Sequence, residues 1–307
     1  MNQLTILLVF AFLSFGNNSC GQKNNFKGKN ITDSINKRHQ TDSIFFQETP
    51  QNLVDIVSKM AVINEVQSAH IGAAGVEGDN YKNFLELKKI AGVEDLLKLT
   101  DNKNAVVACY ASLALADKSY PDLKTIFLKF LSHDKQVPTF SGCFKSSDNI
   151  SSELYHQYWN NVDDKARSSD KMLLQLDSII LFRENSYWLL MTRALENRIY
   201  PAPYKNRIED LAFNSGNREA LFYLCTWYRA DNFDNIKKSL IKYLKKTDFR
   251  KTGTTDYYRT VDELLKFRDS EIEDLIIQKL KKDKHWKNED KKFMSLLGDY
   301  SIYENFD

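Results

Sequence analysis

Residues Val106 to Leu131 read VVACYASLALADKSYPDLKTIFLKFL, and this stretch decides the fold class. In its first half the apolar residues recur at helical spacing, and Asn104 stands just before them as a candidate N-cap. A polar break over residues 117–120 follows, and Pro121 suits the first turn of a second helix, where its missing N–H costs nothing. The stretch therefore predicts two amphipathic helices joined by a tight turn.

Similar helical pairs are predicted further along the chain. The apolar pattern of the second helix returns at 236–244 and 272–280. Helices that correspond to the first helix of the pair are predicted at 186–199, 217–230 and 255–268. Helical pairs that recur every ~30–40 residues are typical of an α-solenoid, in which neighbouring pairs stack over one shared core. With only 11 Gly and 5 Pro in 307 residues, a many-turned all-β fold is disfavoured. We therefore predict an all-α fold, an α-solenoid over residues 50–307.

The stretch from Val106 to Leu131 resembles HEAT-like repeats. Its first half is rich in small residues and Leu, a polar turn follows, and Pro121 and Asp122 open its second half. The resemblance implies stacked helical pairs that present an extended surface to a protein partner. Armadillo-like or tetratricopeptide-like stacking remains an alternative.

An irregular segment over 133–170 interrupts this periodicity, and residues 137–144 within it read as a loop. An insertion on a rigid helical scaffold can contribute to binding. Its aromatic and histidine residues are therefore a possible binding surface, comprising Phe140, Phe144, Tyr155, His156, Tyr158 and Trp159. The alternative is a divergent repeat whose aromatic residues fill the core.

The N-terminal residues predict export and a lipid anchor. Residues 4–15 are mostly apolar but too short to span a bilayer, as in a signal peptide over residues 1–19. Ser19 and Cys20 resemble the end of a bacterial lipobox, of the looser kind seen in Bacteroidetes. This resemblance implies cleavage before Cys20 and its acylation. The polar residues 20–48 then read as a flexible tether, and an ordinary secreted protein or an uncleaved segment is the alternative.

The residues that could carry chemistry form no recognisable signature. Cys143 has His133 and His156 near it in sequence, but their spacing matches neither a nucleophile motif nor a zinc site. Cys109 and Cys225 lie in apolar helical patterns and read as small buried residues. We therefore predict no catalytic, metal-binding or cofactor-binding residues, and no cofactor.

The charge balance bears on the class of partner. Lys and Arg number 43 and Asp and Glu number 41, which leaves a net charge of +2 and disfavours a nucleic-acid binder. The basic run over 279–292 is interpreted as a solvated helix face, with contact to anionic lipid as the alternative.

Together these features predict a lipid-anchored, non-enzymatic scaffold for protein–protein interaction, located in the cell envelope and facing the periplasm or the cell surface. One alternative is a module that binds a glycan or peptide through residues 140–159. An enzyme with an unrecognised site is the other.

Overall fold

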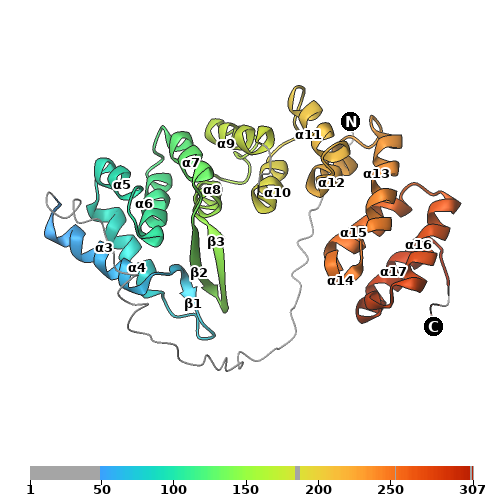
Figure 1. Cartoon of the computed structure of the whole chain (residues 1–307), viewed down its shortest axis with the longest axis horizontal. Helices are drawn as coiled ribbons and strands as arrows, with labels where there is room; N and C mark the ends of the chain where they lie inside the picture. Colours follow the sequence, from blue (N-terminus) through green and yellow to red (C-terminus); the bar gives the residue numbers. More distant parts are fainter. Residues whose placement is uncertain (1–48, 184–186, 253, 305, 307) are drawn as a thin grey trace, which may run out of the picture. The chain divides into compact units, whose positions relative to one another are not determined.

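The computed structural model describes residues 49–183, 187–252, 254–304 and 306 of the chain. The predicted signal peptide, Cys20 and the tether to residue 48 lie outside these residues. The described part is mostly helical, as predicted, and also contains a three-stranded sheet (Figure 1). Within it, no helix combines the length and the apolar character needed to cross a membrane.

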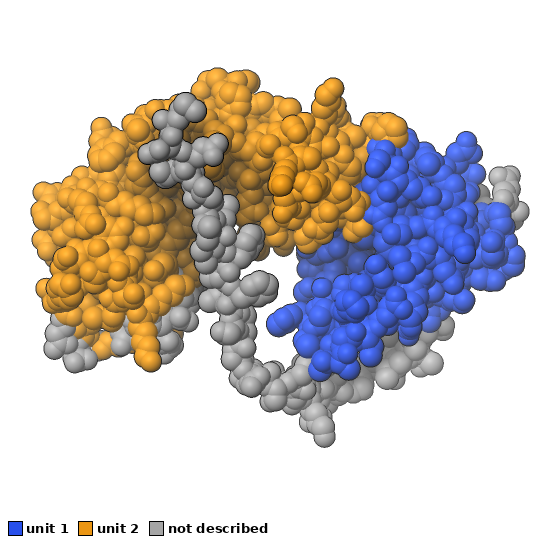
Figure 2. Space-filling view, turned by 180° about the vertical axis from the view of Figure 1, so that it is seen from behind, with its two compact units in different colours: residues 1–120, 133–153 blue, residues 121–132, 154–307 orange. Residues whose placement is uncertain are grey.

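The chain divides into two compact units, which Figure 2 colours separately. Unit 1 comprises the described residues up to Tyr120 together with His133–Glu153, and unit 2 comprises Pro121–Ser132 and everything from Leu154 onward. Unit 1 contains α3 (Gln51–Ile63), β1 (Val66–Ile71), α4 (Asp79–Ile90), α5 (Val93–Leu99), α6 (Ala105–Asp117), β2 (Gln136–Gly142), β3 (Phe144–Asn149) and the start of α8 (Ile150–Asn161).

Helix α6 is the centre of unit 1. Every residue from Val106 to Ala116 is buried, and the helix packs against α3, α4, α5 and the strands β1 and β2. The Asn104 side chain caps it as predicted, accepting hydrogen bonds from the N–H groups of Val106 and Val107 at 3.0 and 3.1 Å. The expectation of an amphipathic helix was wrong here, because a helix that is apolar all round is buried all round.

The sheet corrects the reading of residues 137–144 as a loop. Strand β2 pairs in parallel with β1 and antiparallel with β3, in the order β1–β2–β3. Pro138 made a strand improbable, but it lies one residue before Thr139, where the pairing with β1 begins, so its missing N–H does not interrupt that ladder. Gly142 has a φ of +52° and opens the two-residue turn between the strands, a position that favours glycine.

Unit 2 consists of helices. It comprises α7 (Leu123–Ser132), the remainder of α8, α9 (Lys171–Phe182), α10 (Trp188–Glu196), α11 (Tyr204–Phe213), α12 (Arg218–Trp227), α13 (Phe233–Lys246), α14 (Phe249–Thr252), α15 (Thr254–Leu265), α16 (Ser270–Lys282), the 3-10 helix η1 (Lys284–Glu289) and α17 (Asp290–Asp299). Helices were predicted at the positions of α10, α12, α13, α15 and α16, and these predictions are confirmed. Asn217 and Asp269 cap α12 and α16 by accepting hydrogen bonds from the first N–H groups of each helix.

Six helices of unit 2, α7 and α9 to α13, pack in two rows. In one row α7 contacts α9, α9 contacts α11 and α11 contacts α13; in the other α10 contacts α12. Helices that follow each other in sequence, such as α9 and α10 or α11 and α12, contact each other across the rows. Figure 1 shows α9 and α11 above α10 and α12.

The stretch that predicted a single helical pair is divided between the units. Helix α6 is buried inside unit 1, whereas α7 packs against α9 in unit 2. The two helices and the turn between them were predicted correctly, and they belong to different compact units.

Candidate functional site

The six residues predicted as a binding surface occupy two different places. Phe140 and Phe144 lie on the β2–β3 hairpin of unit 1. Phe144 is 80% exposed beside the hairpin turn, whereas Phe140 is half-buried and has the Lys145 Nζ 4.7 Å from its ring centroid. The other four residues lie on α8, in the part of that helix that belongs to unit 2.

On α8, the tyrosines contact the neighbouring structure. Tyr155 is buried, and its hydroxyl donates a hydrogen bond to Asp177 Oδ1 at 2.6 Å. Tyr158 is half-buried and donates to Asp170, the N-cap of α9, at 3.4 Å. Burial and the adjacent Asp170 carboxylate raise the pKa of Tyr158 to about 12. His156 is exposed, with its ring centroid 6.2 Å from that of Trp159.

Asp177 is the centre of a buried polar network in unit 2. Its carboxylate is fully buried and accepts hydrogen bonds from four side chains at 2.6–3.2 Å, namely Tyr155, Asn197, Arg198 and Tyr200. Burial raises the pKa of Asp177, while these hydrogen bonds and the Arg198 charge act in the opposite direction. The donors come from α8, from the end of α10 and from the segment after it, so the network ties these parts to α9.

Trp159 is held by the same network. Its Nε1 donates to the Asn197 side-chain oxygen at 2.7 Å. The guanidinium groups of Arg167 and Arg193 lie 3.3 and 4.7 Å from its ring centroid, and Arg167 Nε also donates to the Trp159 carbonyl. These contacts favour a structural role for Tyr155 and Trp159, which agrees with the alternative that the aromatic residues of this segment help fill the core.

The three described cysteines differ in their exposure to solvent. Cys109 and Cys225 are buried and free, and burial raises the pKa of both thiols, that of Cys225 to about 11. Cys143 is exposed at the hairpin turn. Among the described residues, no group of three or more His, Cys, Asp or Glu side chains is placed to hold a metal ion.

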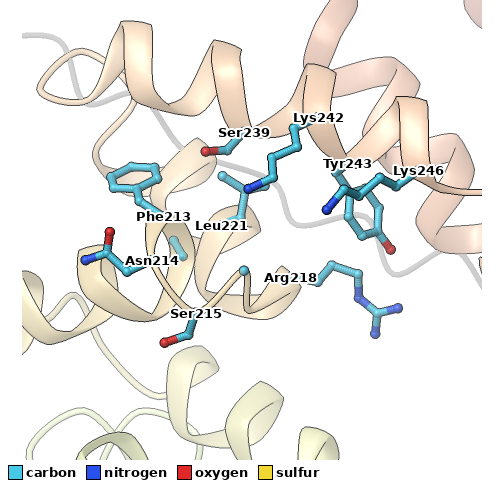
Figure 3. Close-up of a pocket in the computed structure, with 11 residues that line it drawn as sticks. Phe213, Asn214, Ser215, Arg218, Leu221, Ser239, Lys242, Tyr243 and Lys246 are labelled. Carbon is cyan, nitrogen blue, oxygen red and sulfur yellow. The ribbon is translucent and has the colours of Figure 1, made fainter.

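Unit 2 contains a cavity of about 330 Å³ between α11, α12 and α13, shown in Figure 3. We call it the lysine cavity, and its lining comprises Ala212, Phe213, Asn214, Ser215, Gly216, Arg218, Leu221, Ser239, Lys242, Tyr243 and Lys246. Its lining combines apolar side chains with cationic and neutral polar ones. The sequence offered one clue to it, namely Lys242 and Lys246 one helical turn apart.

A second cavity of about 310 Å³ lies between α10, α12 and α15. We call it the tryptophan cavity, and its lining comprises Thr192, Leu195, Glu196, Glu219, Tyr223, Thr226, Trp227 and Arg259. Trp227 is 51% exposed, although it is one of the largest apolar side chains of the unit. No pattern in the sequence predicted a site at Trp227.

A third, more open cavity of about 680 Å³ lies between α13 and α16. Lys245, Lys279, Lys282 and His285 line it together with Asp248 and Asp283, so charges of both signs face it. Lys279 donates a hydrogen bond to the Thr247 carbonyl, at 2.5 Å. Part of the basic run over 279–292 is therefore in contact with the C-cap residue of α13.

The described chain is thus a mostly helical protein with a small mixed sheet, and the three cavities described above lie among the helices of unit 2. Comparison with models of protein families, with curated proteins and with solved structures finds no match to this chain.

Proposed function

We propose that this protein is a lipid-anchored, non-enzymatic helical-repeat scaffold that binds a protein partner in the cell envelope. The observation that carries the proposal is the two-row packing of α7 and α9 to α13, in which alternate helices contact one another. In this proposal α9–α10, α11–α12 and α13–α15 are successive pairs of a solenoid, each burying its apolar face on its neighbours. Such stacks offer long, rigid surfaces suited to protein recognition.

The tryptophan cavity is the part of this surface that we assign to the partner. Residues that dominate the affinity of protein interfaces are enriched in Trp, Tyr and Arg and cluster around pockets. Trp227, Tyr223 and Arg259 meet in this cavity, and the exposed Trp227 ring would be covered by a bound partner. Glu196 and Glu219 also line the cavity, where each is paired with an arginine of its own unit, Arg193 and Arg218 respectively.

The anchor rests on the sequence alone. Acylation of Cys20 would hold the scaffold at a membrane, and the polar residues up to 48 would let it reach partners near the surface. Confinement to one membrane raises the effective concentration of scaffold and partner, so a modest affinity suffices.

The test of binding is a crosslinked pull-down from native membranes with the wild-type chain, Trp227→Ala and Tyr303→Ala. Tyr303 is 82% exposed near the C-terminus and is the matched control for removing an exposed aromatic ring. We expect one partner to be recovered with the wild type and with Tyr303→Ala. Its recovery with Trp227→Ala should fall by about tenfold or more, because an interface residue of this kind contributes about 2 kcal/mol or more. Equal recovery with Trp227→Ala would overturn the assigned surface.

The anchor is tested separately with Cys20→Ala. The wild-type chain should take up a labelled fatty acid and sediment with membranes, whereas Cys20→Ala should incorporate no label. Equal labelling of the two proteins would rule out lipidation at this residue without affecting the assignment of the tryptophan cavity.

A further inference from the structure

We propose that the lysine cavity binds a small organic anion, whose short apolar body lies on the cavity floor and whose phosphate or carboxylate group contacts Lys242 and Lys246. This site is separate from the partner surface, because none of its lining residues lines the tryptophan cavity. The proposal therefore does not depend on the scaffold function.

The two lysines are the available cations. Lys242 and Lys246 lie one turn apart on α13, so their side chains are neighbours on one helix face. In the part of the chain that the structure describes, neither forms an ion pair. Two adjacent ammonium groups repel each other, and an anion between them relieves that repulsion. The cavity lining contains no Asp or Glu that could take this role.

Arg218 also lines the cavity, but its positive charge is already paired. Its Nε and one of its terminal nitrogens contact Glu219 at 2.9 and 2.6 Å, and its other terminal nitrogen contacts Asp256. Glu219 and Asp256 neutralise the charge of the Arg218 guanidinium, and neither of them lines the cavity. The net positive charge that a ligand meets therefore comes from the two lysines on α13.

The remaining lining sets the chemistry of the ligand. Ala212 and Leu221 are buried and Phe213 is half-buried, which gives an apolar floor. Ser239 and Tyr243, from the same helix as the lysines, add hydroxyl groups that can donate hydrogen bonds to oxygen atoms. Figure 3 shows these side chains arranged around the cavity, with Lys242 and Lys246 extending from α13.

The volume limits the size of the ligand. About 330 Å³ is at the small end of the range of ~300–1,000 Å³ found for small-molecule pockets. The site therefore suits one ring or short chain carrying an oxyanion group. Because lysine forms charge-assisted hydrogen bonds with both phosphates and carboxylates, the structure assigns the shared anionic chemistry, and the experiment distinguishes the two groups.

The test is calorimetric titration of the full-length chain in non-ionic detergent with phenyl phosphate, phenylacetate and, as the neutral probe, benzyl alcohol. The double variant Lys242→Gln/Lys246→Gln removes the proposed contacts. The control variant Lys124→Gln/Lys238→Gln removes the same charge from exposed positions outside the cavity, one of them on α13 itself. Far-UV circular dichroism of both variants verifies that they are folded.

We expect at least one of the two anions to bind the wild type at one site, more tightly than benzyl alcohol and less tightly as salt is added. Affinity should fall about tenfold or more in Lys242→Gln/Lys246→Gln and change by less than about twofold in the control. The tighter anion identifies the preferred group. No binding of either anion to the folded wild type, equal weakening in both double variants, or equal affinity for benzyl alcohol would each overturn the proposal.

Discussion

Removing the Asp177 carboxylate should destabilise unit 2 more than any change at an exposed charge. In Asp177→Ala, the buried donors from Tyr155, Asn197 and Tyr200 lose their acceptor, and Arg198, whose side chain is 10% exposed, loses its counter-charge. Breaking a buried ion pair by deleting one partner costs about 3–5 kcal/mol. We therefore expect a loss of that size in the free energy of unfolding of unit 2.

Asp177→Asn separates charge from hydrogen bonding. The amide keeps the size of the side chain and one acceptor oxygen, and Arg198 still donates to the carbonyls of Arg167 and Ser168 at 3.0 and 2.7 Å. Since burial opposes the charged form of Asp177, removing the charge also removes a desolvation cost. The expected loss is about 1–2 kcal/mol.

The assay is urea unfolding followed by tryptophan fluorescence. All four tryptophans of the chain belong to unit 2, so this signal reports unit 2 selectively: Trp159, Trp188, Trp227 and Trp286. The control is Asp231→Ala, which removes a 56% exposed carboxylate paired with Lys205 and should cost less than about 1 kcal/mol. If Asp177→Ala were as stable as Asp231→Ala, the buried network around Asp177 would not be a major source of stability in unit 2.

Two further predictions concern unit 1. Burial and the Asp148 charge raise the pKa of Glu153 to about 7. The folded state therefore binds the proton of the Glu153 carboxyl group more tightly than the unfolded chain does. The free energy of unfolding should fall as the pH rises from about 4.5 to about 7. Glu153→Gln should remove this pH dependence and be more stable than the wild type at pH 8 by up to about 3 kcal/mol. The measurement is hydrogen exchange of the α6 amides. Equal protection of these amides in the variant and the wild type at pH 8 would contradict the prediction. Asn104→Ala should lower the stability of unit 1 by about 1–2 kcal/mol in the same exchange measurement, because two N–H groups of α6 lose their cap. Asn104→Asp keeps an acceptor oxygen and should retain most of the wild-type stability. Equal losses of stability in the two variants would show that the cap contributes little.

The helices of this chain were predictable because their signals are local. The apolar spacing of Val106–Leu131 and the cap at Asn104 lie within a few turns of the helices that they specify. The same holds for α12, which was predicted from residue 217 and begins one residue later, after its N-cap Asn217.

The sheet was missed in part because one of its two pairings, that of β1 with β2, is not local. Strands β1 and β2 lie far apart in sequence, and neither carries a clear alternation of apolar and polar residues. Pro138 and the polar composition of β3 also argued against strands. The hairpin turn at Gly142–Cys143 was the only local signal available.

The candidate sites depend on contacts between distant segments. Tyr155 and Trp159 were predicted as part of a possible binding surface, but their contacts are with Asp177 and Asn197, which lie one and two helices away. The tryptophan cavity joins three helices, so Trp227 acquires significance only when α10 and α15 are placed beside α12. A sequence pattern within one helix could not predict that arrangement.

Site-specific photo-crosslinking tests the central proposal most directly. A photoreactive phenylalanine analogue at Thr226, which lines the tryptophan cavity, is compared in cells with the same analogue at Lys238, an exposed position on α13. Binding of a protein partner over the tryptophan cavity predicts one discrete crosslinked adduct from Thr226 that is absent from Lys238 and lost when Trp227→Ala is added. An adduct from Lys238 with none from Thr226, or an adduct at Thr226 that persists in Trp227→Ala, would contradict the proposal.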